Sequence, residues 1–205
     1  MSCESTGKNE RRVNQFNKIK LVDAMAFQIA SYGVQNGNDT LLDRIDLSCG
    51  AIPEGEFEQV IDLSAPHQFL TLYMQIAEKR FAMAVTELLN MNEGFYKPLE
   101  DFMEQVGRDM KIPAVSDMDQ ALNIYDSFVL DGMPCDETKE VLEKSSSKII
   151  WTKLMDTHQD NWNKVGGDLG VYYQLLQDFI KGLFAESGIV LRIDNQLTFT
   201  LEKAE

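Results

Sequence analysis

The side chains best suited to chemistry gather in one polar segment, residues 156–167 (DTHQDNWNKVGG). His158 and Asp160 stand close together there, followed by Trp162 and Lys164. A histidine beside a carboxylate can act as a general acid or base, or as one ligand of a metal ion. If the protein is an enzyme, we expect a hydrolase-like reaction with His158 and Asp160 as the acid/base groups. The alternative is a solvated loop whose Trp162 packs back on the core, because the sequence offers no third catalytic partner.

The other nucleophilic or ligating side chains stand far apart in the sequence. His67, expected in the first turn of a helix, could cap that helix, lie at the edge of the core or bind a ligand. Cys49 and Cys135 could each be a nucleophile, although most lone cysteines are inert. With Cys3 they make an odd number and contain no CxxC pair. This pattern disfavours a disulfide framework and a zinc ribbon, and it predicts a reduced, cytoplasmic protein.

Several common site motifs are absent from the sequence. It contains no GxGxxG or GxxxxGK[ST] for a nucleotide, no HExxH or ExxH for a metal, and no GxSxG nucleophile elbow. The Gly166-Gly167-Asp168 step could present backbone N–H groups to an anion, but the carboxylate would repel phosphate. We therefore expect no metal and no cofactor.

Composition restricts the partners. The chain has 205 residues, with 19 Lys and Arg against 33 Asp and Glu, which gives a formal charge of −14. That negative field disfavours nucleic acid and anionic membrane surfaces. No run of 18 apolar residues occurs, so no membrane span is expected, and the polar first twelve residues cannot form the apolar region of a signal peptide.

The first half of the chain predicts helices. We expect a loose tail over residues 1–15, then a helix from Phe16 to about Tyr32 that stops at Gly33. Short helices are expected from Thr40 and from Pro53. Further helices are expected over residues 65–91, 97–110 and 116–131, the last starting at a capping box of Ser116 and Asp119. The segment 65–91 is too apolar for a helix with one face in water, so it should be central.

The second half adds strands. Residues 136–147 are compatible with a helix or a strand, residues 148–155 predict a strand, and 156–167 predict a loop. Asp168 is a suitable N-cap for the last helix, and the tail IVLRIDNQLTFTLE predicts a hairpin. The expected class is α+β: several N-terminal helices around a long central helix, packed on a small antiparallel sheet formed mainly by the C-terminal half. We expect a single domain over 16–205, with a helical region (16–115) and a helix-strand-helix-hairpin region (116–203). Whether residues 1–60 form a separate lobe stays open.

The second half resembles the 4-vinyl reductase domain and the related aminothiazoline-carboxylate hydrolase-like proteins, over residues 115–202. The matching outline is a helix, the strand IIWTKLM (149–155), a polar loop, the helix 171–188 with its Gly182-Leu183 step, and a terminal strand at 197–201. The resemblance implies an enclosed pocket between the long helices and the sheet, used for small apolar or aromatic molecules. Many relatives carry cysteines for zinc or thiol chemistry where this chain has 155–158 and 197–199, so that chemistry does not carry over.

An aromatic set supplies the lining that such a pocket needs, although aromatic residues at helical spacing usually fill a core. The expected ligand-binding residues are Phe69, Tyr73, Tyr125, Phe128, Trp151, Trp162 and Tyr172. Three functions follow, in this order of preference. The first is a sensor-like or carrier-like domain that binds a small apolar or aromatic molecule. The second is an interaction protein or scaffold that forms a homodimer, like the transport-complex subunits that share the resembled fold. The third is the hydrolase-like enzyme.

Overall fold

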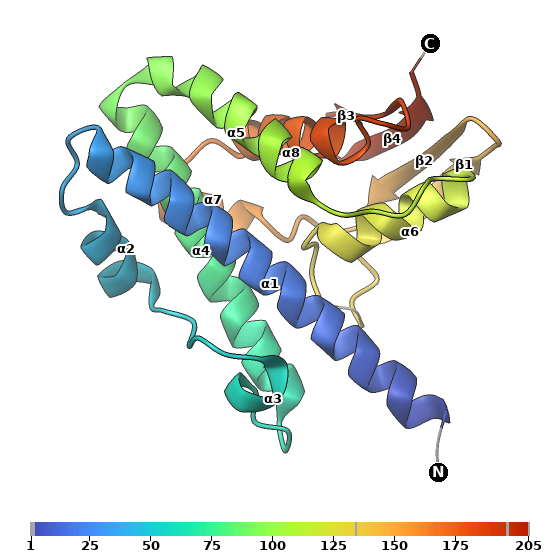
Figure 1. Cartoon of the computed structure of the whole chain (residues 1–205), viewed down its shortest axis with the longest axis horizontal. Coiled ribbons are helices and arrows are strands. Elements are labelled where there is room, and N and C mark those ends of the chain that lie inside the picture. The colour runs from blue at the N-terminus through green and yellow to red at the C-terminus, as the bar shows by residue number, and fades with distance from the viewer. Residues whose placement is uncertain (1–2, 134, 196, 205) are drawn as a thin grey trace. The chain divides into compact units, whose positions relative to one another are not determined.

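The computed structural model describes residues 3–133, 135–195 and 197–204, and this part of the chain is α+β (Figure 1). It divides into two compact units. Unit 1 comprises Met1–Met91, Leu130–Asp136 and Asp160–Gly167, and unit 2 comprises Asn92–Val129, Glu137–Gln159 and Asp168–Glu205, as far as these ranges are described. The expected single domain over 16–205 stays a prediction, because two compact units can belong to one folding domain.

Unit 1 is helical. α1 (Cys3–Gln35) packs along α4 (Pro66–Met91), and α2 (Leu41–Cys49) packs against both. α3 (Phe57–Val60) is a single turn that buries Phe57, and α7 (Gln159–Lys164) contributes most of its length to this unit. α4 is buried continuously from Arg80 to Thr86, which confirms that it is central and explains why its sequence is apolar on more than one face.

One buried cation joins α1, α2 and α4 of unit 1. The Arg80 guanidinium is 7% exposed and bonds Asp23 of α1 at 2.6 Å and Asp46 of α2 at 2.5 Å. It also donates to the backbone oxygen of Gly50 at 2.7 Å, just beyond the end of α2. Burial tends to lower the pKa of Arg80, but the two carboxylates outweigh this and raise it. A planar fork with several donors can hold three acceptors at once, so Arg80 fixes the relative placement of these helices.

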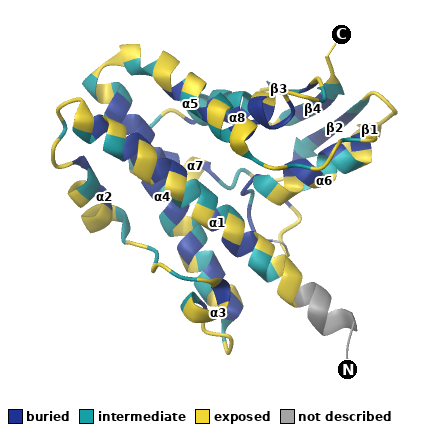
Figure 2. Cartoon of the chain, in the orientation of Figure 1, coloured by how far each residue is buried: buried dark blue, intermediate teal, exposed yellow. Residues whose placement is uncertain are grey.

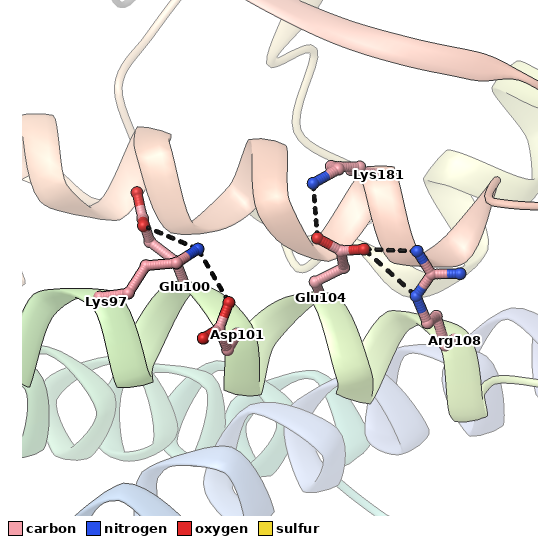
Figure 3. A network of polar contacts seen from close by, with 6 residues as sticks. All are labelled: Lys97, Glu100, Asp101, Glu104, Arg108 and Lys181. Carbon is pink, nitrogen blue, oxygen red and sulfur yellow. Dashed lines mark hydrogen bonds and ion pairs between the residues drawn. The ribbon is translucent and has the colours of Figure 1, made fainter.

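Two helices of unit 2, α5 (Tyr96–Asp109) and α8 (Leu169–Leu183), cross at two glycines. A Cβ on Gly107 would lie 2.1 Å from the Phe179 carbonyl oxygen, and one on Gly182 would lie 1.9 Å from the Glu104 carbonyl oxygen. The backbones therefore touch, and only glycine fits at both positions. Charged side chains line the same crossing, where Glu104 accepts from Lys181 of α8 at 2.6 Å (Figure 3).

The sheet of unit 2 has four antiparallel strands in the order β1-β2-β4-β3. The strands are β1 (Lys139–Lys144), β2 (Lys148–Lys153), β3 (Ile189–Asp194) and β4 (Thr198–Lys203). The central strands alternate buried and half-buried residues, whereas edge strand β1 is mostly exposed (Figure 2). α8 and α6 (Met118–Phe128) pack on this sheet. Within residues 136–147 the structure therefore contains a strand, over 139–144, and no helix, and it confirms the C-terminal hairpin.

Several expected boundaries are wrong. α1 starts at Cys3, so the predicted tail is helical as far as it is described, and the helix runs past Gly33 to Gln35. The helix predicted from Pro53 begins only at Phe57. α6 begins after Asp117, whose carboxylate caps Gln120 N–H at 2.8 Å, in place of the predicted capping box. The predicted loop 156–167 contains α7, which carries the buried Trp162.

Candidate functional site

The structure separates the predicted ligand-binding residues into two sets. Phe69, Tyr73 and Trp162 belong to unit 1, whereas Tyr125, Phe128, Trp151 and Tyr172 belong to unit 2. In unit 1, Tyr73 lies in the hydrophobic core with Phe69 packed edge-on against it at 6.1 Å. Trp162 packs edge-on against Phe81 of α4 at 6.4 Å and is 2% exposed. These three therefore pack as core side chains.

Unit 2 holds a continuous row of aromatic rings over its sheet. Trp151 of β2 stacks on Phe199 of β4 at 5.4 Å, and Tyr125 of α6 meets Trp151 edge-on at 5.1 Å. Tyr173 of α8 extends the row, edge-on to Phe199 at 5.8 Å. The row forms because Trp151 and Phe199 are register partners on neighbouring strands. Phe128, the remaining predicted residue of this unit, is half-buried in the last turn of α6.

Polar groups adjoin the row at its Tyr173 end, and we call Lys153, Asp156, His158 and Tyr173 the Tyr173 cluster. The Lys153 amine lies over the rings of Tyr173 and Phe199, at 5.4 and 5.5 Å from their centroids. The Tyr173 hydroxyl donates to Asp156 Oδ2 at 2.7 Å. Lys153, His158 and Tyr173 are 6%, 2% and 3% exposed, which is unusual for ionisable side chains.

Backbone and side-chain donors converge on the carboxylate of this cluster. Asp156 Oδ1 accepts the backbone N–H groups of His158 at 2.8 Å and Gln159 at 3.0 Å. Burial raises the pKa of Asp156, but the Tyr173 hydroxyl, these N–H groups and the charge of Lys153 together lower it. Asp156 is therefore an ionised acceptor at neutral pH, close to a buried cation and a phenol.

His158 is held among tyrosines. Its ring lies 4.1 Å from that of Tyr172, tilted by 36°, and 6.4 Å edge-on from that of Tyr173. Tyr172 and Tyr173 meet edge-on at 5.2 Å. His158 thus belongs to a buried aromatic surround, and the solvated loop suggested as the alternative is wrong at this residue.

The expected partner of His158 lies in a different setting. Asp160 is exposed in the first turn of α7, whereas Asp156 makes the hydrogen bonds in the Tyr173 cluster. An acid/base role for His158 and Asp160 stays a prediction. Lys153, Asp156 and Tyr173 are not among the predicted site residues. The inward position of Lys153 follows from strand alternation with Trp151, which was a usable signal.

A second lysine lies over the other end of the aromatic row. The Lys139 amine is 5.6 Å from the Tyr125 ring centroid and 5.4 Å from that of Trp151, and it pairs with Asp126. Each end of the row therefore has an amine above ring faces, where the ring quadrupole attracts a cation.

Comparison with known proteins assigns no family. No protein-family model, curated protein or solved structure matches the chain. Within the described residues, no group of three or more His, Cys, Asp or Glu side chains is placed to hold a metal ion. Among the helices of the described part, none is long and apolar enough to cross a membrane. The resemblance to the 4-vinyl reductase domain stays a prediction.

Proposed function

We propose that unit 2 is a sensor-like or carrier-like module that binds a small apolar or aromatic molecule at the Tyr173 cluster. The main support for this proposal is that Lys153 and His158 are buried among aromatic rings. Removing ionisable groups from water is unfavourable, and such groups within an apolar surround are typical of ligand sites. The rings would contact the body of the ligand, and the phenol, amine and imidazole would orient its polar group. A cytoplasmic location is part of the same proposal.

Native mass spectrometry of the purified full chain, before and after mild denaturation, tests this function directly. We expect a small molecule that dissociates on unfolding. Lys153→Met should lose it because the variant keeps the side-chain length but removes the amine. Lys181→Met is the matched control: Lys181 is an exposed lysine of the same unit, 60% exposed and paired with Glu104.

If the ligand is lost during purification, thermal-shift measurements with benzoate, indole and naphthalene derivatives can still detect binding. Binding to the folded state raises the melting temperature by mass action. Stabilisation of the wild-type chain and of Lys181→Met, but not of Lys153→Met, would support the proposal. If no molecule co-purifies and no panel member stabilises the wild-type chain, the proposal is wrong.

A second candidate function is protein interaction, favoured by exposed apolar side chains at one end of the sheet. Leu154, Met155 and Leu197 are 55%, 52% and 47% exposed. They lie together because Lys153 N–H, next to Leu154, donates to the Leu197 oxygen at 2.8 Å. Exposed apolar patches often mark interfaces. Light scattering at micromolar concentration would show a dimer that Leu154→Lys with Leu197→Lys dissociates, and a wild-type monomer would refute this alternative.

A further inference from the structure

A thiol and an imidazole from distant parts of the sequence meet in unit 1. His67, in the first turn of α4, places Nε2 3.4 Å from Sγ of Cys135. The two residues are 68 positions apart in the sequence, and both are exposed. The contact is within hydrogen-bonding distance for sulfur, and a reagent in solution can reach both groups.

A third side chain orients the imidazole. Thr71, one turn further along α4, places its hydroxyl oxygen 3.5 Å from His67 Nδ1. When Nε2 accepts the thiol proton, Nδ1 carries a hydrogen, and this hydrogen points to the Thr71 oxygen. A nucleophile, a base and a group that orients the base are the components of an activated cysteine.

We propose that Cys135 is a nucleophilic thiol site, with His67 as its base, that adds to soft electrophiles of the α,β-unsaturated carbonyl class. The thiol proton passes to His67 Nε2, and the sulfur electron pair forms a bond to the β-carbon. The π electrons of the alkene move toward the carbonyl to give an enolate, whose α-carbon then takes the proton from His67. The product is a thioether, and the addition needs no oxidant, reductant or further co-reactant.

The thiol of Cys135 has a second acceptor besides His67. It lies 3.9 Å from Asp136 Oδ1, to which it can donate, and Asp136 Oδ2 is fixed by the Met133 N–H at 2.8 Å. The contact with His67 Nε2, at 3.4 Å, is the shorter of the two, and it is the one that the addition uses.

Cys49 provides an internal control in the same unit. It is half-buried, its Sγ donates to Met83 Sδ at 3.7 Å, and burial raises the pKa of its thiol. A cysteine that forms less thiolate and is less accessible to reagents in solution reacts slowly, so Cys49 should react more slowly than Cys135.

The experiment labels the full-length chain with N-ethylmaleimide, an α,β-unsaturated carbonyl, between about pH 6 and 9, and follows each cysteine by peptide mass spectrometry. We expect Cys135 to react faster than Cys49 and faster than it does in urea-unfolded chain. His67→Gln should slow Cys135 at least about tenfold near neutral pH and move its pH–rate profile upward. Gln68→Ala, an exposed change in the same helical turn, should leave the Cys135 rate unchanged.

Thr71→Val gives an independent second test, because it keeps the size of the side chain and removes the hydroxyl. We expect an intermediate Cys135 rate, with circular dichroism and the Cys49 rate like those of wild type. The proposal is overturned if Cys135 in the wild-type fold reacts no faster than in the unfolded chain. It is also overturned if folded His67→Gln retains the wild-type Cys135 rate and pH profile.

Discussion

Replacing Gly182 with alanine tests the crossing of α5 and α8 that positions Tyr173. The added Cβ would lie 1.9 Å from the Glu104 carbonyl oxygen and 3.0 Å from Arg108 N, which are both backbone atoms that cannot rotate away. An ordinary C···O contact is about 3.3 Å, so the helices must separate by about 1.4 Å. A gap of that size removes much of the dispersion attraction between the two backbones, and it stretches the Lys181–Glu104 bond.

The expected destabilisation is a difference of two effects. Overpacking in a dense contact costs about 1–3 kcal/mol or more, and the better helix propensity of alanine returns up to about 1 kcal/mol. Because the contact is backbone to backbone, the overpacking cost should lie at the upper end of this range, so we expect a net loss of about 2 kcal/mol in unfolding free energy. For a chain of this size that lowers the melting temperature by about 4–8 °C.

Urea denaturation and thermal melting measure this effect, and two further variants sharpen it. Gly188→Ala meets open space but has a φ of +62°, so it should cost only about 1 kcal/mol. Gly107→Ala, at the same crossing, should destabilise like Gly182→Ala, and the double variant should cost less than the sum because one helix separation relieves both clashes. If Gly182→Ala is neutral or stabilising, as helix propensity alone would give, the close crossing is wrong.

Three further substitutions make separate predictions about charges. Asp156→Asn should lower the unfolding free energy by about 1–2 kcal/mol at neutral pH, because it weakens the hydrogen bond from Tyr173. Because the pKa of Asp156 is lowered in the folded state, this stabilisation is present above about pH 4 and is lost in acid. In a pH series of urea denaturation curves, the difference in unfolding free energy between wild type and variant should therefore shrink as the pH falls. Asp178→Asn should instead raise the unfolding free energy at neutral pH. Burial and Glu100 raise the pKa of Asp178, so its ionised form destabilises the fold, and the variant should gain about 0.5 kcal/mol at neutral pH and nothing below about pH 4. Arg80→Met should cost about 2–4 kcal/mol in chemical denaturation, because it removes the buried cation and leaves two carboxylates facing each other; a change under about 0.5 kcal/mol would contradict the role of Arg80.

The sequence predicts the elements whose signals are local. The apolar stripe of 65–91, the Asp168 cap and the alternation of the C-terminal hairpin each depend on neighbouring residues, and the structure confirms all three. The predicted helix boundaries are wrong where contacts with residues distant in the sequence determine the local structure. The packing of Trp162 on the core was one of the expected alternatives, but no local pattern in residues 156–167 predicts the helical turn there or the contact with Phe81 of α4.

In the candidate sites, too, the sequence predicts what depends on neighbouring residues and misses what depends on distant contacts. Trp151 and Lys153 could be placed on one face of a strand from alternation alone, but their neighbours Phe199 and Tyr173 come from other elements. His67 and Cys135 each looked isolated in the sequence, since spacing carries no signal for a pair so far apart.

The two proposed sites depend on different parts of the fold, so their tests are independent. The Tyr173 cluster requires the α5–α8 crossing, because α8 carries Tyr173 and its backbone touches α5 at Gly107 and Gly182. The Cys135 site requires only the first turn of α4 and the described residues Met133, Cys135 and Asp136 of unit 1. Gly182→Ala should therefore weaken ligand binding in unit 2 while the Cys135 labelling rate stays at its wild-type value at temperatures where the variant is folded. Equal loss of both properties would mean that unit 1 does not keep its structure when unit 2 is disturbed.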